Sequence, residues 1–301
     1  MDALSDVLRS IRLSSAFYFK SDFSAPWGMN VPSVPFAQFH IVVSGQCLLQ
    51  TLKERILLKE GDIVVFPHGI RHWIADSESS VRVSGGEVVE SINAGCPVFQ
   101  GPETNNTLVC GHFEFDRSVA GLFLGELPSI IHISSQNQET NQWLRQITDI
   151  LTFEADNEMP GRDVIIQKLG EVLFIHTLRS YAEGDNHITG VFAALFHERI
   201  SKALKVIHSD YAQNIQIEQL AKVSGMSRTN FINKFRALTG ETPMNYVLQW
   251  RMLKASELLQ NTEQSISQVA EGVGYTAEAA FIRIFKKRTN YTPLKYRLAK
   301  R

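Results

Sequence analysis

The sequence predicts an α+β protein of two domains: an N-terminal antiparallel β-barrel with a helical pair, and an all-helical C-terminal domain. Short β-branched and aromatic runs, broken by Gly, Pro, Asn and Asp, occupy 36–115. Apolar residues then recur at helical spacing, and one pattern of residues occurs twice near the C-terminus. We expect the domains to be 1–185 and 191–301, separated by an acidic, Gly-containing linker.

The duplicated pattern keeps the same residue types at matching positions. These are Ala221, Gly225, Phe231 and Phe235 in the first copy, and Ala270, Gly274, Phe281 and Phe285 in the second. The alanine lets two helices cross closely, the glycine supplies the positive φ of a turn, and the phenylalanines give the second helix an apolar underside. The pattern predicts two helix-turn-helix motifs, at about 217–238 and 266–288.

Capping signals mark the ends of the predicted helices. The copies are offset by 49 residues at the glycines and by 50 at the phenylalanines, so the second turn holds one additional residue. We expect Ser227 and Thr276 to cap the second helix of each motif, and Gly240 and Asn290 to end it in the left-handed conformation. Upstream, a single helix is expected over 191–211.

A connecting helix is expected over 243–261, because apolar residues repeat there at helical spacing. They are Leu248, Met252, Ala255 and Leu259, and Thr-Pro pairs at 242–243 and 292–293 supply helix starts. Such a helix is roughly 27 Å long. Two motifs on this rigid connection can reach successive major grooves, which lie about 34 Å apart on one face of DNA.

The connecting helix and the second motif resemble the AraC/XylS family of bacterial transcription regulators. Arg251, Ala255, Leu258 and Leu259 match the family's linker-helix signature, and 269–286 matches its second-motif signature. The resemblance covers about 196–296 and implies a sequence-specific DNA-binding regulator, an activator rather than an enzyme, that acts with RNA polymerase. The sequence departs from the family at Asn233, where an Arg is frequent, and at Asn290, where Gly is usual.

Charge is distributed unequally between the two expected domains. Residues 191–301 carry 17 Lys and Arg against 8 Asp and Glu, a net charge of +9. Residues 1–190 carry 13 against 23, a net charge of −10. A basic domain beside an acidic one predicts that only the C-terminal domain meets the phosphates of double-stranded DNA.

Polar positions on the second helix of each motif are candidates for DNA contact. A polar stripe usually marks a solvated face, but the duplicated framework and the basic domain favour recognition here. The resemblance implies base-edge contacts by Arg228, Thr229, Asn233, Glu278, Ala279 and Arg283. Phosphate contacts, which fix register without reading sequence, are expected from Ser227, Arg236, Thr276, Lys286 and Lys287.

In the N-terminal domain, one segment runs through a turn, a buried strand and a second turn before it ends in an imidazole. Gly61-Asp62 mark the first turn, Pro67-His68 and Gly69 mark the end of the strand and the second turn, and His72 is the imidazole. The segment resembles the second signature of the cupin barrel, and 40–45 resembles a weaker form of the first. With 109–115 and 127–128, the likeness extends to the sensor domain of a cupin-bearing AraC-type subfamily, which implies a small-molecule or redox effector.

The histidines expected at the effector pocket are His40, His68 and His72. A catalytic cupin holds its metal with a His-x-His pair, a glutamate and a further histidine, whereas Val42 stands two residues after His40. We therefore expect no metal and no other cofactor. A metal-dependent cupin enzyme with an attached DNA-binding domain is the alternative from a different class.

The cysteines are Cys47, Cys96 and Cys110, which are few, odd in number and not in a CxxC arrangement. Neither a disulfide framework nor a zinc site is indicated. Cys96 and Cys110 are the redox candidates, so a cysteine-based oxidant-sensing regulator is a second alternative. The run around Cys110 is typical of a strand interior, where a thiol is usually inert.

Two amphipathic helices are expected after Ile133. Trp143, Ile147, Ile150 and Leu151 mark the first, and Ile166, Leu169, Leu173, Phe174 and Leu178 mark the second. The resemblance implies that this pair forms a homodimer, whereas packing within the domain is an equal alternative. The start of the chain lacks a signal peptide, and no apolar run approaches the roughly 20 residues that cross a membrane, so we expect a cytoplasmic protein with no membrane partner.

Overall fold

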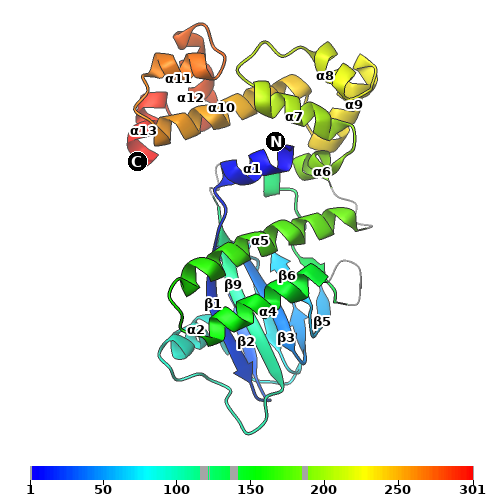
Figure 1. Ribbon diagram of the computed structural model, residues 1–301, viewed down its shortest axis with the longest axis vertical. Helices are drawn as coiled ribbons and strands as arrows, with labels where there is room; N and C mark the ends of the chain where they lie inside the picture. Colours follow the sequence, from blue (N-terminus) through cyan, green and yellow to red (C-terminus); the bar gives the residue numbers. More distant parts are fainter. Residues whose placement is uncertain (1, 116–120, 122, 136–141, 185–188, 301) are drawn as a thin grey trace. The chain divides into compact units, whose positions relative to one another are not determined.

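The computed structural model describes residues 2–115, 121, 123–135, 142–184 and 189–300. The chain forms two compact units, which we describe separately (Figure 1). The sheet unit comprises Arg12–Asp116 and Leu127–His187, and the helical unit comprises Met1–Ile11, Arg117–Glu126 and Ile188–Arg301. Two segments of the helical unit thus fall within the range 1–185, which the sequence analysis gives to the first domain.

The sheet unit contains two five-stranded sheets, in the orders β1-β9-β3-β6-β10 and β5-β4-β7-β2-β8. The bounds are β1 Ser14–Phe23, β2 Gly28–Val31, β3 Ala37–Ser44, β4 Gln46–Gln50, β5 Arg55–Lys59, β6 Ile63–Phe66, β7 His72–Ala75, β8 Val83–Ser84, β9 Asn106–Glu114 and β10 Ile131–Ile133. Side chains from both sheets form one apolar core. The predicted α+β class is confirmed, and the expected barrel is an open pair of sheets rather than a closed cylinder.

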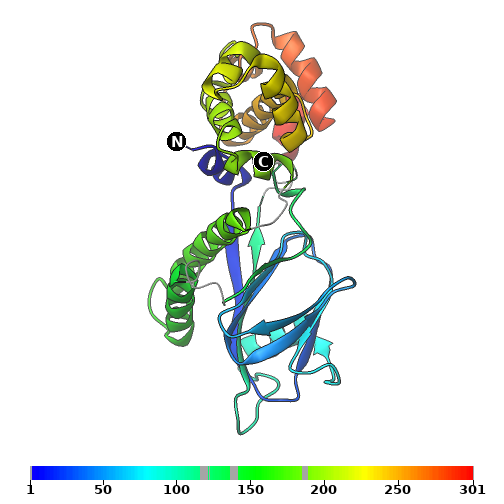
Figure 2. The ribbon, with the colours of Figure 1, turned by 90° about the vertical axis from the view of Figure 1, so that its right-hand side faces the viewer.

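Two helices cover the outer face of the first sheet. They are α4 (Gln142–Asp156) and α5 (Arg162–Glu183), the amphipathic pair that the sequence predicts (Figure 2). α5 contacts β1, β9 and β10, and α4 packs on α5. A shorter helix, α2 (Gly85–Asn93), contacts β1, β2 and β8.

Side chains of β3 alternate between the two faces of the first sheet. Phe39 stacks on Phe113 with ring centroids 4.8 Å apart, and Phe113 lies 4.7 Å from Phe174 of α5. These outward positions bind the helices to the sheet. The residues of opposite parity, Gln38 and His40, therefore face the interior between the two sheets, where a cavity lies.

The helical unit contains both predicted helix-turn-helix motifs. The first is α8 (Ile217–Val223) with α9 (Arg228–Thr239), and the second is α11 (Ile266–Gly272) with α12 (Glu278–Thr289). The connecting helix α10 (Pro243–Asn261) has the predicted range. The unit also contains α1 (Ala3–Ile11), α6 (Gly190–Phe196), α7 (Ile200–Asp210) and α13 (Pro293–Lys300). Within the described ranges, no helix is long and apolar enough to cross a lipid bilayer.

Most of the capping predictions are confirmed. The Ser227 hydroxyl accepts the Asn230 N–H at 3.4 Å, and α9 and α12 end at Gly240 and Asn290 with φ of 73° and 63°. The prediction for Thr276 is wrong, because the residue before α12 is Ala277, which makes no side-chain cap. A backbone bond to Ala270 or Ala221 closes each turn one residue after its glycine, so the additional residue of the second turn comes later and is Thr276.

The single helix predicted over 191–211 is also wrong, because the chain forms α6 and α7 instead. His197 separates them in an extended conformation, with ψ of 121°. Its Nδ1 accepts the backbone N–H groups of Arg199 and Ile200 at 3.2 and 3.3 Å. The imidazole thus satisfies the first donors of α7, a role that Ser, Thr, Asp or Asn usually performs.

The two turn glycines differ in what surrounds them. A Cβ at Gly274, where φ is +83°, would lie 2.4 Å from the Ala212 carbonyl oxygen, whereas one at Gly225, where φ is +61°, would meet nothing within 4 Å. Gly225→Ala should cost about 1 to 2 kcal/mol for its backbone conformation alone. Gly274→Ala should cost about 1 to 3 kcal/mol more because of the clash. Urea unfolding followed by far-UV circular dichroism measures both, and equal losses would contradict the assigned contact.

Candidate nucleic-acid interface and sensor cavity

The second helix of each motif is held by its phenylalanine pair. Phe231 and Phe235 on α9, and Phe281 and Phe285 on α12, are fully buried. In the second motif, Phe285 also meets Tyr296 edge-on, with ring centroids 5.4 Å apart. Because the apolar side of each helix is buried in this way, its polar side faces solvent.

All eleven residues that the sequence analysis proposes for DNA contact are exposed. At the first motif they are Ser227, Arg228, Thr229, Asn233 and Arg236, and at the second they are Thr276, Glu278, Ala279, Arg283, Lys286 and Lys287. Arg228 is paired with Glu218 of α8, Nε to Oε1, at 2.8 Å, with side chains 61% and 64% exposed. Such an exposed ion pair contributes little energy, so Arg228 can exchange Glu218 for another acceptor.

Arg251 of α10 ties the connecting helix to segments on either side of it. Its Nε donates to the Tyr211 carbonyl at 2.6 Å, and its Nη2 donates to the Gln213 carbonyl at 2.7 Å. Its Nη1 donates to the Gly274 carbonyl at 3.4 Å, in the turn of the second motif. The guanidinium also lies over the Tyr275 ring, 5.7 Å from its centroid. One side chain thereby fixes the approach to α8 and the turn before α12.

In the sheet unit, the structure brings His40 and His72 together and adds Cys110. The Nε2 atoms of the two imidazoles lie 2.8 Å apart, and Cys110 Sγ lies 3.0 Å from His40 Nδ1. All three side chains are buried. His68, by contrast, is exposed and bonds to the Leu127 carbonyl through Nε2 at 2.8 Å, outside this cluster.

The direction of each hydrogen bond in this cluster follows from one fixed acceptor. The Ile70 carbonyl, 2.8 Å from His72 Nδ1, can only accept, so Nδ1 carries the proton. Burial lowers the pKa of His72 to about 4 and that of His40 well below its ordinary value, so both rings are neutral near pH 7. His40 Nε2–H therefore donates to His72 Nε2, and the Cys110 thiol donates to His40 Nδ1.

This cluster does not fit a cupin metal centre. The facing imidazole nitrogens bond to each other, and Cys110 lies at the far nitrogen of His40. Val42, at the position of the second histidine of a His-x-His pair, is buried in the core. Across the described residues, no group of three or more His, Cys, Asp or Glu side chains is placed to hold a metal ion.

Comparison with known proteins identifies the family. Residues 2–183 match the family described as "Cupin", and residues 220–299 match the one described as "Helix-turn-helix domain". The HTH-type transcriptional regulator AlkR of Acinetobacter baylyi is 28% identical over 99% of both chains. A putative AraC-like transcription regulator of Streptomyces lividans is 26% identical over 99% of this chain and 98% of its own. The chain belongs to the AraC-type transcription regulators with a cupin domain.

A further relative carries a more specific description. The RCS-specific HTH-type transcriptional activator RclR of Escherichia coli is 25% identical over 92% of this chain and 89% of its own. These relatives align with the chain across both units. DNA binding and transcription regulation are therefore properties of the AraC-type family to which this chain belongs.

In this AraC-type regulator, a cavity of about 280 Å³ opens beside His40 and Cys110. It is bounded by β1, β2, β3, β9 and the first residues of α2. Gln38 also lines it, a residue that the sequence analysis missed. The sequence pattern could have identified Gln38, because it stands two positions before His40 in a strand and therefore lies on the same face.

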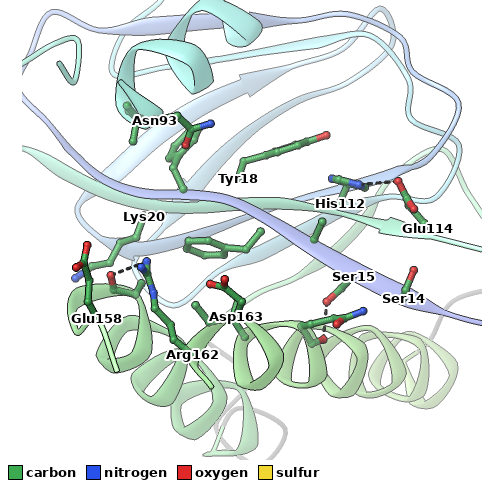
Figure 3. Close-up of a pocket in the computed structure, with 17 residues that line it drawn as sticks. Ser14, Ser15, Tyr18, Lys20, Asn93, His112, Glu114, Glu158, Arg162 and Asp163 are labelled. Carbon is green, nitrogen blue, oxygen red and sulfur yellow. Dashed lines mark hydrogen bonds and ion pairs between the residues drawn. The ribbon is translucent and has the colours of Figure 1, made fainter. Parts of the chain in front are cut away.

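A larger and more polar cavity, of about 850 Å³, lies between β1 and the ends of α4 and α5 (Figure 3). Some of its polar groups are paired: Lys20 Nζ lies 2.5 Å from Asp156 Oδ2, and His112 Nε2 lies 3.1 Å from Glu114 Oε1. Tyr18 lines both cavities at a β-bulge, where the register of β1 shifts. A bulge at this position directs a side chain between the two spaces.

The three cysteines, of which Cys96 and Cys110 are the redox candidates, differ in environment. Cys96 is exposed, whereas Cys110 and Cys47 are buried. Burial raises the pKa of Cys110 well above its ordinary value and that of Cys47 to about 12. Because the thiolate is the reactive form, this environment disfavours oxidation of Cys110.

The neutral histidines make the stability of the sheet unit depend on pH. Folding lowers the pKa of His72 from 6.5 to about 4, so its contribution is complete above pH 6.5 and is lost as the pH falls toward 4. We expect the free energy of unfolding to fall between pH 6 and 5, with His72 contributing about 1.4 kcal/mol per pH unit. His72→Asn should remove that part of the slope.

Urea unfolding in a Trp250→Phe background measures this slope, because the remaining tryptophans, Trp27, Trp73 and Trp143, all belong to the sheet unit. An identical slope with and without the His72→Asn substitution would contradict a neutral, buried His72.

Proposed function

We propose that this regulator activates transcription by placing α9 and α12 in successive major grooves of its operator and by contacting RNA polymerase. One observation carries the proposal: each of the two helices has a fully buried apolar side and an exposed polar side in a domain of net positive charge. The activating direction is supported by RclR, whose description is that of a transcriptional activator. A small molecule bound in the sheet unit supplies the signal.

Individual contacts follow from side-chain chemistry. Arg283 suits guanine O6 and N7, which a guanidinium pairs with bidentately, and Asn233 suits adenine in the same way. Glu278 accepts from cytosine N4, and Ala279 meets a thymine methyl group. Arg228 and Thr229 complete the base-reading set. Phosphates are held by Ser227, Arg236, Thr276, Lys286 and Lys287, which position the protein without specifying sequence.

Catalysis is not part of the proposal. The relatives that align with both units are described as regulators, and the His40–His72 pair bonds to itself instead of presenting its nitrogens to a metal. The buried thiol of Cys110 likewise makes an oxidant a weaker candidate signal than a small molecule.

The contact assignments predict different losses for two neighbouring residues of α12. Arg283→Ala should cost about 1 to 3 kcal/mol on the operator and relax specificity at one base pair, because it removes a base contact. Lys286→Ala should weaken binding to all duplexes alike and lower the salt dependence by about one counterion. Titrations against matched and singly mismatched duplexes separate the two effects, and losses for Arg283→Ala that are equal on every sequence would reject base reading by Arg283.

We also propose that two copies associate through α4 and α5. This helical pair and the turn between its helices expose apolar side chains that their own sheet does not cover. They are Ile150 (46% exposed), Phe153 (56%), Met159 (54%), Val164 (61%), Ile165 (40%) and Val172 (40%). Apolar side chains concentrated on one pair of elements indicate a protein interface, and a second copy offers an identical, self-complementary surface.

Dimerisation predicts that Phe153→Asp raises the dissociation constant of the dimer at least tenfold, because the interface would have to bury a carboxylate. Leu52→Asp is the matched control, since Leu52 is 95% exposed in the same unit but far along the chain from α4 and α5. Sedimentation equilibrium of the full chain gives both constants. A wild-type protein that stays monomeric at tens of micromolar, or equal effects of the two substitutions, would contradict this interface.

A further inference from the structure

The cavity beside His40 has the size and lining of a site for one small molecule. Its volume is about 280 Å³, and Phe19, Met29 and Val89 contribute apolar walls. An apolar cavity of about 150 Å³ is large enough to hold benzene. Gly85 and Gly86, at the start of α2, carry no side chain that would narrow the space. The cavity therefore has room for a single substituted ring or a short chain.

Most of the buried polar capacity in this cavity is already used. His40 bonds to Cys110 and to His72, as described above. Gln38 differs, because it is only 5% exposed and its Oε1 has no hydrogen-bond partner within the described part of the chain. Buried polar atoms are almost always paired in folded proteins, so an unpaired amide oxygen at a cavity wall indicates a position where a ligand bonds.

We propose that this cavity binds a small, uncharged, mainly apolar molecule that carries one hydroxyl group, and that Gln38 selects it by hydrogen bonding to that hydroxyl. The inference rests on the proposed function, in which a small molecule in the sheet unit supplies the signal. A hydroxyl group suits an amide because it donates to Oε1 and can accept from Nε2. The apolar remainder of the ligand fits the aromatic and aliphatic walls.

The charges around the cavity argue against an ionised ligand. The described residues that line it include no Lys or Arg. They include one carboxylate, Glu90, which is exposed. A buried charge needs a paired counter-charge, which the walls do not provide. Among the described residues around the cavity, the feature that would favour an anion is the start of α2, where the first backbone N–H groups belong to Gly85 and Gly86. An anionic probe is therefore part of the test.

Three probes that share a ring separate these possibilities: benzyl alcohol, toluene and benzoate. Calorimetric titration of the full chain with each probe gives the ratio of affinities for benzyl alcohol and toluene. We expect Gln38→Leu to lower this ratio at least tenfold, because the hydroxyl loses its partner while the apolar walls remain. Undiminished toluene binding shows that the variant keeps its fold and its cavity. Gln50→Leu is the control. Gln50 lies on β4, outside the cavity lining, and its Nε2 donates to the Thr51 carbonyl, so this substitution should leave the ratio unchanged.

Three outcomes would overturn the inference: an unchanged ratio in Gln38→Leu, benzoate binding more tightly than benzyl alcohol, or no binding of any probe. Operator binding by the same proteins, with and without benzyl alcohol, tests the proposed function separately. If the wild type does not bind its operator specifically, the proposed function is rejected, but the selectivity of the cavity is not. If Gln38→Leu leaves the ratio of benzyl alcohol to toluene affinity unchanged while the wild type recognises its operator, only the role of Gln38 is rejected.

Discussion

The arrangement of the two helix-turn-helix motifs depends on one guanidinium, that of Arg251. Arg251 donates to carbonyls of Tyr211 and Gln213, before α8, and of Gly274, in the turn before α12. Its planar fork reaches all three at once, which the single ammonium of a lysine cannot do. Because both motifs are attached to α10, this clamp limits how far either one can rotate. A fixed separation between two recognition helices is what allows one chain to contact two grooves in register.

The features that the sequence predicted in the helical unit are local ones. Helix ends at Gly240 and Asn290 and the full range of α10 depend on residues within one turn of each other, so spacing alone identifies them. The cap predicted at Thr276 was wrong and the break at His197 was missed, because spacing does not determine either feature. An inserted residue can be placed at several points of a turn, and an imidazole that caps a helix has no distinctive sequence pattern.

The cavity beside His40 was harder to predict, because its parts come from strands far apart in the chain. His40 and His72 were named from their signatures, but the bond of His40 to Cys110 joins residues 70 positions apart and follows only from the pairing of β3 with β9. His68 was grouped with them on residue type, although it is an exposed residue in the turn after the strand. Gln38 carried no motif, yet strand alternation alone places it on the face of His40.

The strength of any signal from this cavity is bounded by how differently the ligand binds the two states of the regulator. A single neutral hydrogen bond to a buried amide contributes about 0.5 to 1.5 kcal/mol. If that bond forms in only one state, it shifts the equilibrium by about 2- to 13-fold, which overlaps the lower part of the usual range of allosteric coupling. The buried His40–His72–Cys110 chain is neutral and has its bonds satisfied, so it resists reorganisation. The adaptable element is then Gln38, the buried amide whose oxygen no described residue engages.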